Sequence, residues 1–311
     1  MFRFLHGLLV VMVACWLSPA GAASVVFLSP GHATDGYWAA YARFMQAAAN
    51  RLDITLTVRY SNRDTRQLLE LARDALQGPD RPDYLLFSNE LNVAPEILRL
   101  SEQSNVKLFA VNNTLTDDQI RILGDLSQRY PRFLGSLVGN DEEGGYLTAK
   151  YLITRSPVAK SAQMSEMLAF SGTNNTPVSL KREQGMYRAL AEHPEIRLRQ
   201  IVLGGWRRDR AYEQARVLLK RYPNINLIWA ANDLMAFGAM DAARETGREP
   251  GKDIMFSAIN WSPPSLEAMH GRLTALVGGH FMLGGLAMVL VHDYEVSEVA
   301  TRKAIGAHQA T

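Results

Sequence analysis

Cysteine is almost absent from this chain. Its 311 residues contain a single cysteine, Cys15. One cysteine excludes an intrachain disulfide and a zinc site built from several thiolates. Cys15 also lies inside an N-terminal apolar segment, so removal of that segment would leave no thiol nucleophile.

An excess of either charge is also missing. The chain has 33 Lys and Arg against 31 Asp and Glu, a formal net charge of +2, and no basic run. Proteins that bind nucleic acids or membrane surfaces usually carry a basic patch, so we expect no nucleic-acid partner. The composition, 47% hydrophobic and 21% charged, is typical of a folded globular protein.

Long apolar runs are confined to the N-terminus. A short positive start, Met1-Phe2-Arg3, precedes an apolar stretch over residues 5–17 and the small-residue motif Ala20-Gly21-Ala22. This order predicts a signal peptide over residues 1–23, cleaved after Ala22 or Ala23, and hence a periplasmic protein.

Two alternatives for this segment stay open. An uncleaved anchor would need an apolar run of about 20 residues, which the stretch does not reach. A lipoprotein would use Cys15, which follows Met12-Val13-Ala14, although Met12 departs from the usual cleavage box.

Catalytic motifs are absent as well. The chain has no Gly-x-Ser-x-Gly, His-Glu-x-x-His or Gly-x-Gly-x-x-Gly. The segment 247–252 resembles a phosphate loop only superficially, because Pro250 removes an N–H and Asp253 replaces the hydroxyl residue. The seven histidines are scattered, with no pair at metal-ligand spacing. We therefore expect a binding protein rather than an enzyme, with no metal and no cofactor.

Apolar strand-like runs alternate with amphipathic helical segments along the rest of the chain. This alternation predicts a doubly wound α/β fold, and about eleven strands are too many for one compact sheet. We expect two parallel-sheet lobes joined at a hinge, with an N-terminal lobe at 24–138, to which 281–311 returns, and a C-terminal lobe at 139–280. The expected strands are 24–28, 54–58, 84–87, 106–111, 133–138, 167–170, 198–203, 227–230, 254–259 and 274–277, and the expected helices 37–52, 66–76, 94–101, 142–153, 180–192, 211–220, 234–245, 264–269 and 283–291.

Polar residues follow many of these strands. Parallel sheets bind ligands at the carboxyl ends of their strands, and an asparagine there offers one acceptor and two donors without charge. A single asparagine can equally be a turn or helix-cap residue. The asparagines in question are Asn89, Asn112, Asn113, Asn232 and Asn260.

Several motifs, in this order, resemble the type I periplasmic binding proteins of the ribose-binding family, which are related to the ligand domains of lac-repressor-like regulators. The resemblance covers residues 25–280 and implies that family's two-lobed fold. It is carried by Leu28-Ser29-Pro30-Gly31 leading to Gly36-Tyr37-Trp38, by 138–145, by Phe170-Ser171-Gly172 with Arg182-Glu183-Gln184-Gly185-Met186, and most strongly by the Asn-Asp-x-x-Ala-x-Gly-Ala pattern in 230–239.

The resemblance also implies a ligand cleft. It would give Tyr37, Trp38 and Trp206 as aromatic faces for a sugar ring, the asparagines above as polar contacts, and Arg182 as a charged contact. His280 falls where the family often has a glutamine near the hinge. Each of these residues also has an alternative role. The aromatic residues could pack in the core, Arg182 could lie on a solvated helix face, and His280 could be a structural residue.

Two departures from the family pattern qualify these expectations. The family often has aspartates at the positions of Asn112 and Asn260. Their absence puts a simple pentose or hexose in doubt and favours an anionic or acceptor-rich ligand, with Arg182 as an unpaired cation. Beyond Val291 the chain is polar, and no last strand is expected there.

The resemblance implies an exported solute-binding protein. It would be a monomer that closes around a small polar ligand, sugar or sugar-like, and presents it to the permease of an ABC transporter. A periplasmic sensing partner of a membrane signalling receptor is the alternative, and an exported α/β hydrolase a further one.

The first prediction concerns export. Because the small-residue motif ends at Ala22, the mature chain should begin at Ala23 or Ser24. Mass spectrometry of periplasmic protein measures this directly. An intact form that begins at Met1, or a lipidated Cys15, would contradict it.

Overall fold

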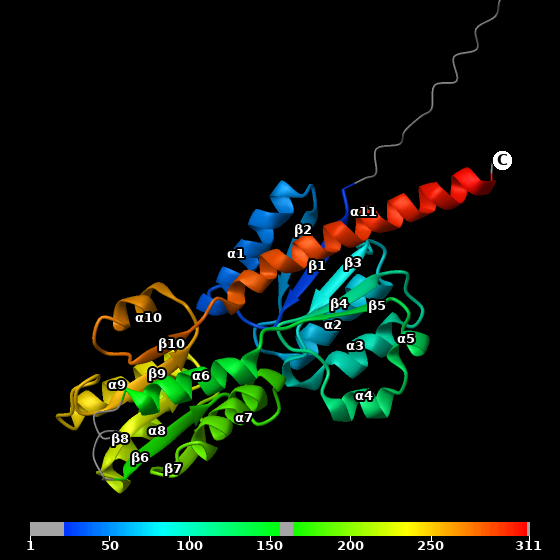
Figure 1. The fold of residues 1–311 in the computed structure, drawn as a ribbon. Coiled ribbons are helices and arrows are strands. Elements are labelled where there is room, and N and C mark those ends of the chain that lie inside the picture. Colours follow the sequence, from blue (N-terminus) through cyan, green and yellow to red (C-terminus); the bar gives the residue numbers. More distant parts are fainter. Residues whose placement is uncertain (1–21, 156–163, 310–311) are drawn as a thin grey trace, which may run out of the picture.

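The chain folds into two lobes, each built on a five-stranded parallel sheet. The structure, a computed structural model, describes residues 22–155 and 164–309. Most of the predicted signal peptide, Cys15 included, lies outside the described residues. Figure 1 shows the two lobes one after the other along the chain, with the segment after β10 returning to the first. The predicted α/β class with two doubly wound lobes is confirmed.

Both sheets have the same topology. The strand order is β2-β1-β3-β4-β5 in the first lobe and β10-β9-β8-β6-β7 in the second, and all pairings are parallel. The described residues therefore hold ten strands rather than about eleven. The strands are β1 (Ser24–Ser29), β2 (Thr55–Tyr60), β3 (Tyr84–Phe87), β4 (Lys107–Val111), β5 (Phe133–Leu137), β6 (Ser165–Ser171), β7 (Ile196–Leu203), β8 (Ile225–Ala230), β9 (Met255–Ile259) and β10 (Ala275–Val277).

Helices cover both faces of each sheet. This is why the central strands read as continuous apolar runs: every residue of β3 is buried, because each of its faces meets a helix layer. The helices are α1 (Gly36–Arg51), α2 (Thr65–Gln77), α3 (Ala94–Ser101), α4 (Asp117–Leu123), α5 (Leu126–Arg129), α6 (Asp141–Thr154), α7 (Pro177–Ala191), α8 (Arg208–Arg221), α9 (Asp233–Glu245), α10 (Pro263–Ala268) and α11 (Leu283–Gln309), with short 3-10 turns η1 (Glu90–Asn92) and η3 (His280–Met282).

Two short helices, α4 and α5, were not predicted. They have little apolar periodicity, and their starts are fixed by side-chain caps instead. Thr116 and Gln119 form a reciprocal capping box at α4, and Asp125 accepts from two backbone N–H groups at α5. Cap residues were visible in the sequence, but without an apolar stripe they were not interpreted as helices.

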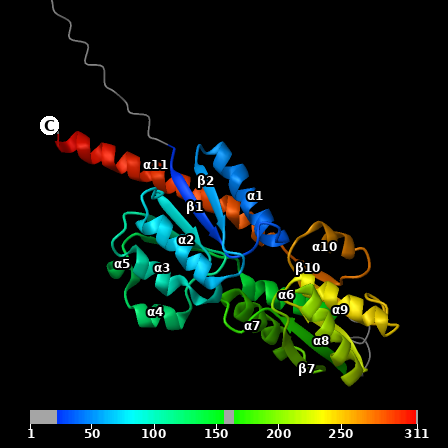
Figure 2. The same ribbon diagram turned by 180° about the vertical axis from the view of Figure 1, so that it is seen from behind.

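The polar C-terminal segment is helical and runs along the first lobe. α11 extends well beyond the predicted end at Val291 and lies beside α1 in both views (Figures 1 and 2). Its buried residues Ala287, Met288 and Val291 join the core of that lobe. Lys107 of β4 pairs with Glu295 at 2.8 Å and with Glu298 at 2.7 Å, so the polar residues are held by specific partners.

The chain passes between the lobes twice in its described part. The first passage, residues 138–140, joins β5 to α6, and the second, around Gly278 and Gly279, joins β10 to η3. The second lobe completes all its strands before the chain returns to the first lobe as the helix α11.

Glycines set the helix crossings of the second lobe. At the α6–α7 crossing, a methyl group on Gly185 would overlap the Glu142 carbonyl and lie 2.6 Å from the backbone nitrogen of Tyr146. Gly145 meets the Arg182 backbone in the same way. The two helices therefore approach at backbone contact, which fixes where Arg182 of α7 lies relative to the start of α6.

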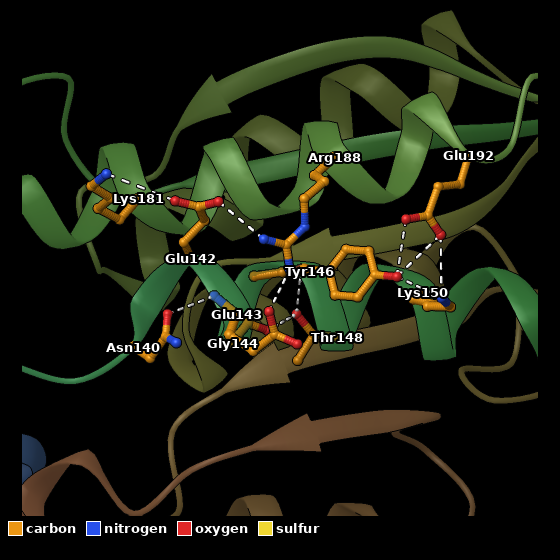
Figure 3. Close-up of polar contacts among 11 residues, drawn as sticks. Asn140, Glu142, Glu143, Gly144, Tyr146, Thr148, Lys150, Lys181, Arg188 and Glu192 are labelled. Carbon is orange, nitrogen blue, oxygen red and sulfur yellow. Dashed lines mark hydrogen bonds and ion pairs between the residues drawn. The ribbon is translucent and has the colours of Figure 1, made fainter.

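Charged side chains cover this crossing on the outside (Figure 3). Arg188 lies over the Tyr146 ring at 4.1 Å and pairs with Glu142 at 3.0 Å, while Lys150 pairs with Glu192 at 3.2 Å. Such exposed pairs each contribute little, so the glycine contact underneath dominates the packing.

No helix in the described ranges is both long enough and apolar enough to cross a membrane.

The second prediction tests the glycine contact. Gly185→Ala should lower the free energy of unfolding by about 1–3 kcal/mol, because the new methyl group overlaps backbone atoms that cannot move independently of α6. Urea denaturation measures this. Gly36→Ala is the control, since a methyl group at this helix start meets nothing within 4 Å. Equal stability of the two variants would show that α6 and α7 can separate without cost.

Candidate ligand-binding cleft

A cavity lies between the lobes at the carboxyl ends of the sheets. In both sheets the strand order reverses next to the first strand of the lobe, between β1 and β3 and between β6 and β8. Such reversals leave a crevice where ligands bind in open α/β sheets. The cavity has a volume of about 180 Å³, and its wall includes Trp38, Ser61, Arg63 and Glu90 from the first lobe and Thr173 and Trp206 from the second.

Trp38 forms the apolar wall of the first lobe. It follows the start of α1, where Asp35 accepts from the Tyr37 backbone N–H at 3.2 Å. The indole packs onto Gly31, where a β-carbon would overlap it, and edge-on against Tyr37 with ring centroids 5.1 Å apart. Only 5% of Trp38 is exposed, so the ring is rigid.

Trp206 forms the facing wall of the second lobe. Its φ of 65° is a left-handed conformation that costs a bulky residue about 1–2 kcal/mol. Gly172 makes room for it, because a β-carbon there would fall inside the indole. The Arg182 guanidinium lies 5.7 Å from the ring centroid. The strained turn after β7 thus holds the indole against Arg182 and the cavity.

Arg182 is paired, contrary to the sequence-based expectation of an unpaired cation. Its Nε donates to Asp141 Oδ1 at 2.8 Å, and its Nη1 to the Ala231 carbonyl at 2.7 Å. Both side chains are over 90% buried. Asp141 opens α6, and the glycine crossing brings α7 next to it. The protein supplies the anion, so Arg182 gives no reason to expect an anionic ligand.

His280 joins the same cluster at the second passage between the lobes. Its Nε2 lies 3.5 Å from Asp141 Oδ1, and its ring packs on Gly139 of the first passage. Burial, and then the Arg182 charge, lower the pKa of His280 to about 4, against the opposing pull of Asp141. The imidazole is therefore neutral at pH 7 and acts as a packed hinge residue.

Two of the predicted asparagines cap helices. Asn89 is fully buried, accepts from the Ala94 N–H at 2.9 Å, and donates to the Thr114 carbonyl at 2.8 Å and to Gln119. Asn232 accepts from the Met235 N–H at 2.9 Å as the cap of α9. Both side-chain amides are hydrogen-bonded to protein groups, as expected for an asparagine that stabilises a turn or a helix start.

Asn112 and Asn260, the positions of the missing carboxylates, also have protein partners. Asn112 accepts from the Tyr37 hydroxyl, and burial raises the pKa of that phenol. Asn260 donates to Asp233 Oδ1 at 3.1 Å. Asp233 also accepts from Ser262, so a carboxylate is present beside Asn260, contributed by α9 rather than by the strand end.

Asn113 links the two lobes. Its Oδ1 accepts from the Val178 N–H of α7 at 2.9 Å, and its Nδ2 donates to Glu90 Oε2 at 3.0 Å and to Ser88 Oγ at 3.3 Å. Only 2% of the residue is exposed. Through Glu90 it also contacts the cavity wall.

The structure adds residues that the sequence did not nominate. Arg63 follows β2 in a left-handed turn, where it pairs with Asp35, and Glu90 follows β3. Thr173 follows β6. All three come just after strand ends, the same signal that pointed to the asparagines, but from the sequence only the asparagines at such positions were considered.

Glu90 has the most altered acidity in the cavity wall. Burial raises the pKa of Glu90 to about 7, partly opposed by the positive charge of Arg63 and reinforced by Asp35. The carboxyl group is therefore near half-ionised at neutral pH.

Within the described residues no group of three or more His, Cys, Asp or Glu is placed to hold a metal ion.

Known proteins share this fold and parts of this sequence. The family model described as periplasmic binding protein domain matches residues 25–278. A crystal structure of a periplasmic sugar-binding protein from Pseudomonas fluorescens is 50% identical, with a TM-score of 0.81, over 88% of this chain and 80% of that one. The arabinose-transporter binding protein of Shewanella sp. ANA-3, bound to α- and β-L-arabinofuranose, has a TM-score of 0.74 at 21% identity, over 88% of this chain and 85% of that one, and shows the fold alone.

Curated relatives match over shorter segments. The galactofuranose-binding protein YtfQ of Escherichia coli (strain K12) is 30% identical over 106 residues, 33% of this chain and 33% of that protein. The HTH-type transcriptional regulator MalR of Clostridium butyricum is 28% identical over 130 residues, 42% of this chain and 37% of its own length. The chain thus spans little more than a third of the first curated relatives it matches. The resemblance to type I periplasmic binding proteins is confirmed, and since the family model covers most of the sequence, the chain belongs to the periplasmic binding protein domain family.

Proposed function

We propose that this protein is an exported solute-binding protein that captures one small neutral sugar between its lobes and presents it to an ABC transporter. The observation that carries the proposal is the cavity between Trp38 and Trp206, with one indole from each lobe. Aromatic faces stack on the apolar faces of sugar rings, and a ligand that touches both lobes stabilises the closed form.

The size of the cavity supports a monosaccharide. Pockets for drug-sized ligands are usually about 300–1,000 Å³. A cavity of about 180 Å³ suits a smaller guest, such as one pentose or hexose ring. The relatives agree in kind, since the names of the similar proteins include sugar, galactofuranose and arabinofuranose binders.

The charges around the cavity favour a neutral ligand. Arg182 is paired with Asp141 and Arg63 with Asp35, so each guanidinium already has a carboxylate. An anionic ligand would have to compete with these buried or half-buried partners. A neutral polyol can donate to Glu90 and accept from Arg63 without displacing either pair.

The membrane partner and the state of the free protein follow from this role. The closed shape is what a permease would recognise, and we propose a monomer. Genes for a permease and an ATPase beside this one would support transport, and a receptor gene would support the signalling alternative. The same wall residues form no nucleophile–base pair in the described part of the cavity, which is why we propose binding without turnover.

The third prediction tests the ligand class. L-Arabinose, D-galactose and D-allose are compared with D-galacturonate by thermal shift and calorimetric titration. At least one neutral sugar should raise the melting temperature by several degrees, since a ligand at about 100 times its Kd adds about 2.7 kcal/mol. D-Galacturonate should bind more weakly than D-galactose. Stabilisation by the acid alone, or conversion of a sugar to product, would refute the proposal.

The fourth prediction tests the aromatic wall. Trp206→Ala should weaken binding of the sugar found above by about 1–3 kcal/mol, the scale of one stacked aromatic contact. The folded lobe should remain, because Trp206 only borders the core. Trp261→Ala is the control, since Trp261 is 44% exposed and is not part of the cavity wall. A large loss of stability with unchanged affinity would make Trp206 a core residue.

A further inference from the structure

The amino end of α7 is capped by a residue from the other lobe. Its own cap residue, Thr176, makes no capping hydrogen bond, and the Thr176 hydroxyl pairs with Thr173 at 2.7 Å. Pro177 has no N–H, so the first free backbone donor of the helix is that of Val178. Asn113 accepts from it at 2.9 Å. A helix start needs such an acceptor, and here it is present only while the lobes are in contact.

The orientation of the Asn113 amide depends on Glu90. An ionised carboxylate only accepts hydrogen bonds, so it requires the NH₂ side of Asn113 to face it. Nδ2 donates to Glu90 Oε2 at 3.0 Å, which leaves Oδ1 directed at Val178. Because the Asn113 side chain is buried, solvent does not offer a replacement donor.

Glu90 also faces the ligand. It is part of the cavity wall together with Trp38 and Trp206. Oε2 of Glu90 accepts the hydrogen bond from Asn113 Nδ2. Within the described residues the second oxygen, Oε1, has no hydrogen-bond partner. A carboxylate with a free oxygen in a cavity wall is a strong acceptor for a ligand hydroxyl group. The acceptor that the family often has after β4 is an asparagine here.

We propose that Glu90 is the hydroxyl acceptor of the cleft and that, through Asn113, it couples the occupied cavity to the hydrogen bond that holds the lobes together. The ligand contact rests on the proposed function, whereas the link from Glu90 to Val178 does not. Glu90 thereby replaces the strand-end aspartate and adds a connection to closure.

The coupling makes binding depend on pH. The charged and ionisable groups around Glu90 are Arg63 and Asp64 before α2, Asp35 before α1, and the Tyr37 hydroxyl of α1. Burial outweighs Arg63, and the pKa of Glu90 is about 7. A ligand hydroxyl donates more strongly to the ionised carboxylate than to the neutral acid. Affinity for the sugar should therefore increase as the pH rises towards 7 and decrease as it falls, because ligand binding favours loss of the Glu90 proton.

The fifth prediction is tested first without any ligand. Hydrogen exchange by NMR gives the protection factor of the Val178 amide, corrected for intrinsic exchange. It should be about threefold to tenfold lower in Glu90→Gln than in the wild type, because a glutamine amide donates as well as accepts and no longer fixes the orientation of Asn113. Asn113→Ala should abolish the protection, while Glu96→Gln, an exposed glutamate on the next helix, should behave as wild type.

Calorimetric titration with L-arabinose, D-galactose and D-allose then tests the ligand contact in the same four proteins. Whichever sugar binds should bind about threefold to tenfold more tightly at about pH 8 than at about pH 6 in the wild type, and independently of pH in Glu90→Gln. Equal and pH-independent affinity in the wild type and Glu90→Gln would overturn the ligand contact. If none of the three sugars binds, the proposed function fails, and the coupling is judged from Val178 protection alone. Equal protection in the wild type and Glu90→Gln would overturn the coupling, and lower protection in Glu90→Gln would uphold it.

Discussion

The buried ion pair between Arg182 and Asp141 is the interaction on which the geometry of the cleft depends. Asp141 begins α6 immediately after the first passage between the lobes, and His280 lies beside it at the second passage. Arg182 also holds the carbonyl that ends β8 and lies under Trp206. One charge pair thus ties together both connections and the aromatic wall. Loss of either partner would leave a buried charge without compensation, which is far more costly than loss of a surface pair.

Close backbone contact makes that pair possible. Gly145 and Gly185 allow α6 and α7 to touch, and Gly238 does the same for α8 and α9 against Arg208. The Gly172 position leaves space for the strained Trp206. The glycines of the family motifs therefore act through packing: each removes a side chain where a helix or a ring must come closer than a β-carbon permits.

Polar groups divide into those that hold the protein and those left for a guest. Asn89, Asn112, Asn232 and Asn260 have protein partners that fix turns, caps and neighbours. The polar groups that border the cavity include residues that follow β2, β3 and β6. Arg63 of the cavity wall and Arg182 beside Trp206 each have a carboxylate partner, which is the basis on which we propose a neutral ligand.

The sequence by itself determined the α/β class, the two lobes and most strand and helix positions, because apolar periodicity and cap residues are local signals. It also nominated Trp38, near the start of α1, and Trp206, in the turn after β7, and both lie in the cavity wall. Tertiary structure alone decided which polar residues meet: Asp141 and Arg182 are 41 residues apart, and Asn113 and Val178 are 65 apart on different lobes. The last helix was predicted only as far as Val291, and its extension to Gln309 was missed for the same reason. Glu295 and Glu298 of this helix pair with Lys107. A sequence pattern contains no information about which distant side chains the fold brings within hydrogen-bonding distance.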